Sequence, residues 1–288
     1  MKVLVTGGTG FIGSHVIDNL VARGIEPVIF DQRRTREVEH ETILGDVRDR
    51  TAVFQAVSQT DATIHLAGIL GTAEQVDDPD PAIETNILGA MNVFKAMRHF
   101  TRPGVYITLG NHWMNNTYSI TKSTTERFAL MANNEWETRI AIVRAVNAYG
   151  PRQKTGPVKK IIPSLVMASL RDEPMNVYGD GMQVADMVYV TDLAEALVRA
   201  LVYDHDCYDR IMECGPGLPT TVMDVANEIF KQTGTGLIVH NPMRAGEPEG
   251  AVVMADPGTL KPLDMHAEDF YPLGDGIARS IEYYRTLL

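Results

Sequence analysis

The stretch TGGTGFIG, residues 6–13, decides the fold. It follows a short apolar run, Val3 to Val5, and opens a segment, Phe11 to Arg23, whose apolar residues recur at helical spacing. The stretch satisfies both a GxGxxG and a GxxGxxG spacing. Glycines between a strand and a helix let the backbone approach a pyrophosphate, and the N–H groups at the helix start face that anion. The stretch therefore predicts a dinucleotide-binding turn.

A carboxylate follows this turn where a dinucleotide-binding unit needs one. The run from Pro27 to Asp31 predicts a second strand that ends in Asp31. A carboxylate there accepts hydrogen bonds from ribose hydroxyls and repels a 2′-phosphate, which favours NAD over NADP. Arg33 and Arg34 leave NADP open, because they are either exposed loop cations or contacts for a 2′-phosphate.

Further β-branched runs alternate with room for helices, which predicts an α/β fold built on a Rossmann-type, doubly wound parallel sheet. These runs are Ala62 to Leu66, Val105 to Thr108 and Arg139 to Arg144. The composition changes after Asn147, so we expect a NAD-binding domain over residues 1–150 and a smaller, mainly substrate-binding α/β domain over 151–288. Residues 186–212 are expected to return to the first domain.

Composition excludes several classes of protein. The 288 residues carry a formal charge of −11, so nonspecific nucleic-acid binding is not expected and phosphates must be met by placed N–H groups and a few local cations. The two cysteines are too few for a disulfide framework, and no metal site is expected. No signal peptide is evident, and the apolar runs are shorter than the roughly 20 residues of a membrane span. We expect a cytoplasmic protein without membrane contact.

Tyr118 and Lys122 lie four residues apart in a segment with helical spacing, so they share one face. A nearby ammonium favours the phenolate and lowers the phenol pKa, which makes tyrosine a usable acid or base near neutral pH. Read alone, the pair is an ordinary surface pair of a helix. Together with the glycine turn it indicates proton transfer beside a dinucleotide.

These features resemble the extended short-chain dehydrogenase/reductases, and within them the NAD-dependent nucleotide-sugar epimerases and dehydratases. The resemblance covers nearly the whole chain. It rests on VTGGTGFIGSHV (5–16), GDVRD (45–49), HLAG (65–68), ETNILGAMNV (84–93), YSITK (118–122), RAVNAYGPRQ (144–153), VYGDGMQVADMVYVTDLAEA (177–196) and RAGEPEG (244–250).

The resemblance implies roles for particular residues. Tyr118 is the implied acid/base, Lys122 binds the nicotinamide ribose, and Thr108 is the candidate catalytic hydroxyl. Asn147 faces the substrate and Arg244 meets its pyrophosphate, while the tract from about residue 157 to 178 covers the nucleotide. The remaining cofactor contacts implied are Gly7, Gly10, Phe11, Ile12 and Gly13 at the pyrophosphate, Asp31 at the adenosine ribose, Asp46 and Val47 at the adenine, and Leu66 and Ala67 beside the cofactor.

The sequence departs from this family at the catalytic hydroxyl. Tyr118 lies only ten residues after Thr108, and the position expected to carry the hydroxyl falls on Leu109 or Gly110. Thr108 is then either catalytic or only a strand-end residue. Other residues that could supply the hydrogen bond are Asn111, Asn115, Asn116 and Thr117. The Asp-Glu pair that dehydratases place here is also absent, which favours epimerisation over loss of water.

A second departure concerns the phosphates. Ala185 precedes Asp186 where the family commonly has an arginine, so Lys159, Lys160 or Arg152 compensates, or the substrate is not an ordinary nucleotide sugar.

We therefore expect an epimerase of the UDP-sugar 4-epimerase type, with tightly bound NAD and a transient hydride transfer. The alternatives are a dehydratase, decarboxylase or reductase of the same family, or a catalytically weak dinucleotide-binding sensor. The resemblance also implies a homodimer, formed through helices that carry residues 92–98 and 118–131.

Overall fold

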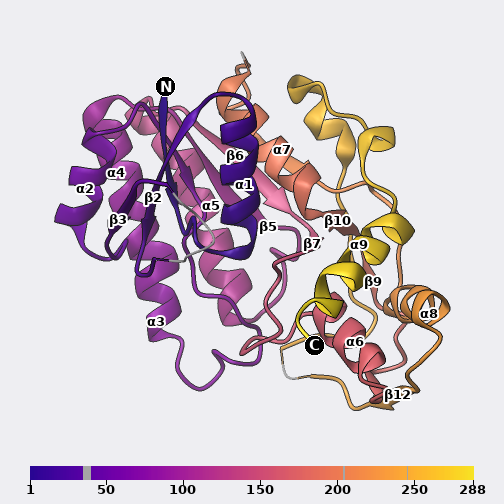
Figure 1. Ribbon diagram of the computed structural model, residues 1–288. Coiled ribbons are helices and arrows are strands. Elements are labelled where there is room, and N and C mark those ends of the chain that lie inside the picture. The colour runs from indigo at the N-terminus through magenta and orange to yellow at the C-terminus, as the bar shows by residue number, and fades with distance from the viewer. Residues whose placement is uncertain (35–39, 204, 245) are drawn as a thin grey trace.

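The structure is a computed structural model that describes residues 1–34, 40–203, 205–244 and 246–288. Within these residues, seven parallel strands form one sheet in the order β11-β6-β5-β4-β1-β2-β3, seen on the left of Figure 1. Its strands are β1 (Lys2–Thr6), β2 (Glu26–Asp31), β3 (Thr42–Leu44), β4 (Ala62–His65), β5 (Gly104–Leu109), β6 (Ile140–Ala145) and β11 (Ile211–Cys214). The predicted α/β fold with a Rossmann-type parallel sheet is confirmed.

Helices cover both faces of this sheet. Successive residues of a strand point to opposite faces: Val3 and Val5 pack into one buried cluster, and Leu4 packs into another. The first face carries α1 (Phe11–Ala22) and α7 (Val190–Val202), and the second carries α2 (Arg50–Ser58), α4 (Ala90–Phe100) and α5 (Thr117–Trp136). Between β4 and α4 lie α3 (Asp80–Ala82) and a π-helix, η1 (Ile83–Gly89).

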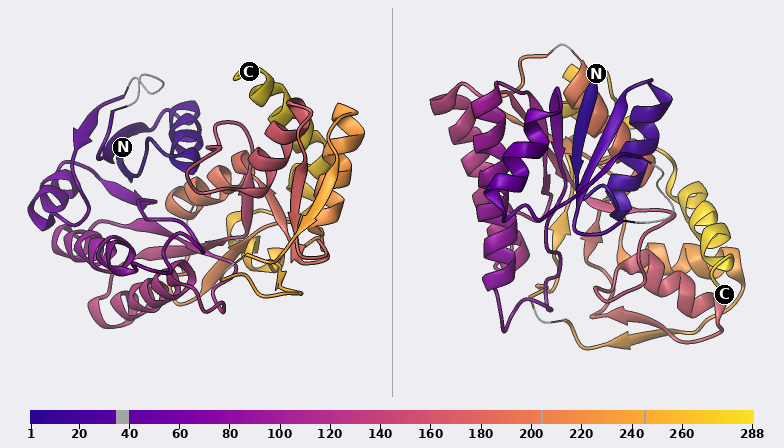
Figure 2. Two further views of the ribbon diagram at one scale, coloured as in Figure 1. Left: turned by 90° about the horizontal axis from the view of Figure 1, so that it is seen from below. Right: turned by 60° about the vertical axis from the view of Figure 1, so that its left-hand side comes forward.

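A smaller α/β part lies beside the sheet, at the lower right of Figure 1 and in both views of Figure 2. The described residues form short parallel pairs there, each joining strands distant in sequence: β7 (Asn147–Tyr149) with β10 (Met187–Tyr189), β8 (Met175–Tyr178) with β12 (Ile238–Asn241), and β9 (Val184–Ala185) with β13 (Val252–Val253). Three helices pack around a third buried cluster: α6 (Ile161–Leu170), α8 (Val222–Thr233) and α9 (Leu273–Arg285). Two 3₁₀ helices, η2 (Pro257–Leu263) and η3 (Ala267–Asp269), precede α9.

The chain passes between the two parts more than once. After β7 it builds α6, β8 and β9 of the smaller part, and then α7 returns to pack against α1. Next, β11 joins the large sheet beside β6, in register from Ile211 opposite Ile142 to Cys214 opposite Ala145. Of the remaining elements, α8, β12, β13 and α9 belong to the smaller part, whereas η2 packs against β11 and α7 of the large part.

Among the described residues, no helix has the length and apolar character needed to cross a bilayer. The same ranges of the chain contain no cluster of His, Cys, Asp and Glu side chains that could hold a metal ion.

Candidate active site

A cavity of about 1190 Å³ opens where the carboxyl ends of β1, β2, β4, β5 and β6 face the smaller part. This edge is where open parallel sheets bind ligands. The cavity brings together nearly all of the side chains that the sequence singled out. Those that line it are Gly7, Gly10, Phe11, Ile12, Gly13, Asp31, Val47, Leu66, Ala67, Thr108, Tyr118, Lys122, Asn147 and Arg244.

The glycine turn forms a cradle that side chains would fill. Gly7 has a φ of 71°, and a Cβ there would lie 2.9 Å from the Ala67 backbone nitrogen. A Cβ on Gly13 would lie 2.7 Å from the Gly8 Cα, and one on Gly10 would lie 3.0 Å from the Gly7 carbonyl oxygen. Helix α1 begins directly after Gly10, which has no side-chain cap, so its first N–H groups face the cavity. This cradle fits a dinucleotide pyrophosphate.

Asp31 lies at the end of β2, beside this turn. One of its carboxylate oxygens accepts hydrogen bonds from the Thr9 backbone nitrogen, at 3.2 Å, and from the Thr9 hydroxyl, at 2.7 Å. These bonds hold the carboxylate at the edge of the cradle. Arg33 also lines the cavity, whereas Arg34 is exposed and does not.

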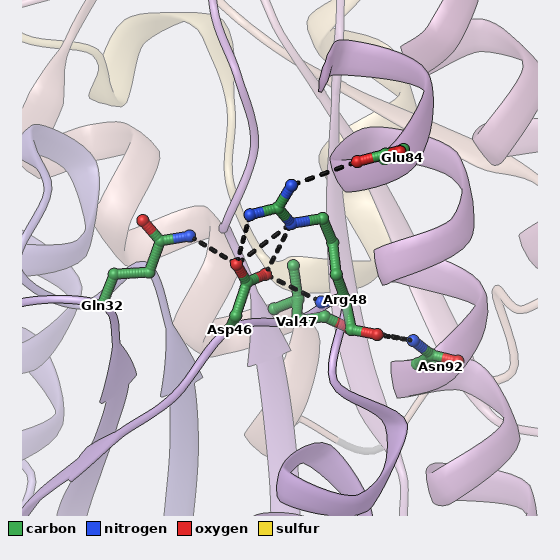
Figure 3. A network of polar contacts seen from close by, with 6 residues as sticks. All are labelled: Gln32, Asp46, Val47, Arg48, Glu84 and Asn92. Atoms are coloured by element: carbon green, nitrogen blue, oxygen red, sulfur yellow. Dashed lines mark hydrogen bonds and ion pairs between the residues drawn. The ribbon is translucent and has the colours of Figure 1, made fainter. Parts of the chain in front are cut away.

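Asp46 is the predicted cofactor residue that does not line the cavity; Arg48 lines it instead. Figure 3 shows the reason: the Asp46 carboxylate binds the Arg48 guanidinium, with Nη2 2.7 Å from Oδ2, and accepts a hydrogen bond from Gln32. Arg48 also donates to Glu84 at 3.1 Å. Sequence reasoning missed Arg48, although the GDVRD motif contains it.

Tyr118 and Lys122 lie on the first turns of α5. The Asn116 side chain caps this helix by accepting a hydrogen bond from the Ser119 backbone nitrogen at 2.9 Å. The Lys122 ammonium lies over the face of the buried Tyr106 ring, 4.2 Å from its centroid. Helix capping and this contact therefore fix where both side chains enter the cavity.

The ionisation of this pair differs from the expectation. Burial raises the pKa of Tyr118 to about 12, so the expected lowering of the phenol pKa by Lys122 is wrong for the structure as it stands. Burial also lowers the pKa of Lys122 to about 7, although the Glu126 carboxylate opposes that shift. The two residues share the start of α5 as expected, but burial alone sets the direction of the Tyr118 shift.

Thr108 is the residue before the last of β5, and it lines the cavity. Its Oγ1 is buried and has no hydrogen-bond partner among the described residues. A buried hydroxyl without a partner is costly unless a ligand supplies one. Thr108 therefore has a hydroxyl available to a ligand in the cavity.

The structure distinguishes the four other residues that could supply the hydrogen bond in place of Thr108. Asn111 lines the cavity, whereas Asn115, Asn116 and Thr117 do not. Asn116 caps α5, and the Thr117 hydroxyl donates to the Gln75 carbonyl at 3.0 Å. Asn111 is thus the alternative that remains.

At the other end of the cavity, cations and carboxylates form a cluster. The Arg244 guanidinium lies 3.4 Å from both Glu74 and Glu247, and 5.6 Å from the centroid of the Tyr178 ring. Lys160 also lines the cavity; burial lowers its pKa, Glu74 and Glu247 oppose that shift, and Arg244 adds to it. Lys160 and Arg244 are therefore neighbours in the same electrostatic environment.

The other candidates for a phosphate contact differ from Lys160. Lys159 lines the cavity but is exposed. Arg152 binds Asp18 and His15 on α1 and does not line the cavity, so it is not available for a phosphate. Asn147 lines the cavity, and its amide donates to the Asp186 carbonyl at 3.1 Å.

Two nearby histidines take no part in lining the cavity. His65 is buried and stacks on Tyr106, and its Nδ1 lies 2.7 Å from the Thr6 hydroxyl. Burial, and then the charge of Lys122, lower the pKa of His65 to about 3, so it remains neutral. The Nδ1 of His112 lies 3.1 Å from the Gly110 carbonyl. Neither ring is placed as a base.

Comparisons with known proteins identify the family of the chain. A family model described as "NAD dependent epimerase/dehydratase family" matches residues 3–111 and 107–215. A UDP-N-acetyl-alpha-D-glucosaminuronate decarboxylase of Bacillus cytotoxicus is 27% identical, over 99% of this chain and 98% of the relative. A putative UDP-glucose 4-epimerase of Methanocaldococcus jannaschii is also 27% identical, over 85% of this chain and 87% of the relative. The structure of Thermus thermophilus UDP-glucose 4-epimerase in complex with NAD is 25% identical, with a TM-score of 0.90 over 100% of both chains.

Proposed function

The chain belongs to the NAD dependent epimerase/dehydratase family, whose cofactor is NAD, and on that premise we propose that it is a nucleotide-sugar epimerase acting at carbon four. The observation that carries the proposal is the cavity itself. It joins the glycine cradle, the Tyr118–Lys122 pair with the Thr108 hydroxyl, and the Lys160–Arg244 pair of cations. These three groups match the dinucleotide, the reacting hydroxyl and the substrate diphosphate.

The cofactor residues follow from the first of these groups. Gly7, Gly10 and Gly13 bring the backbone to the NAD pyrophosphate, with the N–H groups of Phe11 and Ile12 at the start of α1. Asp31 accepts from the adenosine ribose, and Val47, Leu66 and Ala67 form the wall beside the cofactor. Lys122 donates to the nicotinamide ribose. When bound, NAD supplies the acceptor and donor of a hydride and, in its oxidised form, a positive charge that favours a phenolate close to it.

Tyr118 moves the proton. Its Oη takes the proton of the sugar 4-hydroxyl and returns it after the keto sugar has presented its other face. With a pKa of about 12, the phenol is protonated at neutral pH, so it is ready to donate. Accepting a proton requires added positive charge beside the ring. Thr108 Oγ1 completes the arrangement with a hydrogen bond to the reacting oxygen.

The cations at the far end hold the substrate's diphosphate. Arg244 offers a planar guanidinium, and Lys160 adds a second charge where Ala185 offers none. The Asn147 amide contributes a neutral contact to the substrate. In a chain with a formal charge of −11, such local cations are needed to attract an anion.

The carboxylates of the cavity favour epimerisation over dehydration. Loss of water needs a second acid or base close to the carbon beside the ketone. Asp31 is held at the glycine turn, and Glu247 is held by Arg244 and by the Thr72 hydroxyl at 3.2 Å. Gly110 and Asn111, which follow β5, carry no acid. Epimerisation needs only Tyr118, since the same phenol serves both directions.

Decarboxylation is the second candidate, because a uronate decarboxylase matches nearly the whole chain. A 4-keto uronate is a β-keto acid, which loses carbon dioxide without a further acid group. The experiment is to incubate the purified protein with UDP-glucose, UDP-glucuronate and dTDP-glucose and to identify products by NMR. We expect conversion of UDP-glucose to its 4-epimer with no net change in NADH. A pentose product from UDP-glucuronate, or a 4-keto-6-deoxy sugar, would replace the proposal with a lyase, and no turnover with NAD retained would favour the sensor.

We also propose a homodimer through α4 and α5, together with η1, which runs directly into α4. Leu88, Ile120 and Phe128 are large apolar side chains on these helices, and they are 56%, 51% and 36% exposed. A face of this kind is typical of a contact between subunits. Light scattering on the eluting protein tests the proposal, and a monomeric mass would contradict it. We keep the cytoplasm as the proposed location, which the two free, buried cysteines support.

A further inference from the structure

Glu126 is a buried carboxylate on α5, the helix that carries Tyr118 and Lys122. Residues four apart lie on one face of a helix, so Glu126 follows Lys122 on the face that Lys122 shares with Tyr118. The Glu126 side chain is only 5% exposed, and Lys122 is buried as well. A carboxylate is rarely buried to this extent unless it is paired. The buried side of α5 therefore needs a cation from another element.

Arg144 on β6 is this cation. Its Nε and Nη2 donate to the two carboxylate oxygens of Glu126, at 2.9 and 2.7 Å, and its Nη1 donates to Glu213 on β11 at 3.0 Å. In the sheet, Arg144 lies in register between Thr108 of β5 and Glu213. A bidentate contact of this kind fixes both the position and the plane of a carboxylate. Glu126 is therefore held beside the strand position of Thr108.

Lys122 makes no ion pair with the residues that the structure describes, although it is buried. The titratable or charged groups that face it are the Tyr118 phenol and the Glu126 carboxylate on its own helix, the Tyr106 ring on β5 and the neutral His65 ring on β4. Among these described groups, only Glu126 carries a negative charge at neutral pH. In agreement with this arrangement, burial lowers the pKa of Lys122 and the charge of Glu126 raises it.

Stability alone does not explain the pair of Glu126 and Arg144. Buried ion pairs are often no more stable than apolar side chains of similar volume. A buried ammonium, in contrast, loses its proton easily unless an opposite charge lies close to it. The carboxylate lies one helical turn beyond such an ammonium, where its charge has this effect.

We propose that Glu126 is a positioning residue that keeps the Lys122 ammonium charged, and that Arg144 holds the carboxylate in the place where it does so. The charge matters because Tyr118 accepts and releases its proton more easily with positive charge beside the ring. This consequence for catalysis rests on the proposed function. The effect on Lys122 does not, since it is measured without turnover.

Titration of Lys122 itself tests the proposal. Protein stripped of nucleotides is labelled with ¹³C-lysine, the Lys122 signal is identified by its absence from Lys122→Met, and its chemical shift is followed by NMR as the pH is raised. We expect the midpoint to fall by about one pH unit in Glu126→Gln, and to stay within about half a unit of the wild type in Glu126→Asp, which keeps the charge. Glu213→Gln is the matched control, because Glu213 binds the same arginine from β11. Its Lys122 midpoint should equal that of the wild type.

An unchanged midpoint in Glu126→Gln would overturn the proposal. Equal shifts in Glu126→Gln and Glu213→Gln would overturn it too, because the disturbance of Arg144 would then be the cause. If Glu126→Gln does not fold, the double variant with Arg144→Gln removes both charges of the buried pair. A lower Lys122 midpoint is expected there as well, and an unchanged one would again contradict the proposal.

The pH profile of turnover provides the second readout. In Glu126→Gln, the fall of kcat on the alkaline side should move to lower pH by the same amount as the Lys122 midpoint, whereas a purely structural role would lower kcat equally at every pH. A shifted midpoint in a protein that turns over no nucleotide sugar would support the role of Glu126 and count against the proposed function alone.

Discussion

The Lys122 ammonium lies 4.2 Å from the centroid of the Tyr106 ring, so the cation rests on a buried aromatic face between strand β5 and helix α5. This contact keeps an ammonium inside the protein at the point where the cavity meets α5. Burial lowers the pKa of Lys122 to about 7, which leaves the group divided between its charged and neutral forms at neutral pH. A ligand that brings negative charge or a hydrogen-bond acceptor would favour the charged form.

Replacing Lys122 should stabilise the protein in a pH-dependent way. The pKa is about 7 in the folded chain and 10.5 in the unfolded one, so protonation favours the unfolded state. Burial of Lys122 therefore lowers the free energy of unfolding by its full amount below pH 7. This loss becomes smaller as the pH rises toward 10.5, by about 1.4 kcal/mol per pH unit. We expect Lys122→Met to unfold with a free energy a few kcal/mol higher than the wild type at pH 6.5, and with a smaller difference at pH 9.5. Urea unfolding at both values measures this, and a difference independent of pH would contradict it.

Removing the Tyr118 hydroxyl should abolish proton transfer but not cofactor binding. Tyr118→Phe is expected to lower kcat about 10²- to 10⁴-fold, the usual contribution of a placed acid or base. Tyr203→Phe is the control, since Tyr203 lies under Arg199 and away from the cavity. Activity of Tyr118→Phe within ten-fold of the wild type, with NAD retained, would remove Tyr118 from the mechanism.

Thr108 allows its catalytic and structural roles to be separated. Because its buried hydroxyl has no partner among the described residues, Thr108→Val removes an unsatisfied polar group and should leave the unfolding free energy unchanged or higher. We expect kcat to fall by about 10²-fold in Thr108→Val, and Thr108→Ser to retain most of it. A valine variant with full activity would assign Thr108 a structural role and leave Asn111 as the remaining donor.

The close packing of the glycine turn predicts a large effect of a single methyl group. A Cβ on Gly13 would lie 2.7 Å from the Gly8 Cα, in backbone that cannot move aside. Gly13→Ala should lose NAD and destabilise the fold by about 1–3 kcal/mol. Gly274→Ala on α9, where the nearest atom is a flexible Glu228 oxygen at 3.4 Å, should be neutral or slightly stabilising. Retained NAD per chain and thermal unfolding provide the measurements; NAD at wild-type level in Gly13→Ala would show that the turn yields.

Lys160 and its neighbour Lys159 form a matched pair for the diphosphate site. Lys160→Ala should weaken UDP binding about ten-fold or more and reduce its dependence on salt, while leaving uridine binding unchanged. Lys159→Ala should change the UDP affinity and its salt dependence much less, because the Lys159 side chain is exposed. If Lys160→Ala and the wild type bind UDP with equal affinity, Lys160 does not bind the diphosphate and Arg244 is the remaining cation for that role.

Most of the large sheet could be predicted from local sequence patterns. The runs that end at Asp31, Thr108 and Arg144 became β2, β5 and β6 within one residue at each carboxyl end, because buried parallel strands are continuous apolar segments. The short strand β3 and the paired strands of the smaller part were not identified, because pairs of two to four residues depend on partners far away in the sequence.

The sequence predicted those site residues that a single motif places. It did not predict the contacts that several elements make with the same side chain. Arg48 meets Asp46 from its own loop but Glu84 from a π-helix, which no local spacing indicates. Arg152 was a candidate phosphate contact until the fold paired it with Asp18 and His15. The pKa of Tyr118 depends on how deeply the phenol is buried, and the sequence does not specify burial.

The path of the chain between the two parts determines which truncated fragments can fold. Because β11 completes the large sheet beside β6 and α7 covers α1, a fragment that stops near residue 150 would leave an open sheet edge and a bare apolar helix. Such a fragment is expected to aggregate when expressed. Because the chain crosses between the two parts more than once, neither part is a continuous segment, and both must be produced, purified and refolded together.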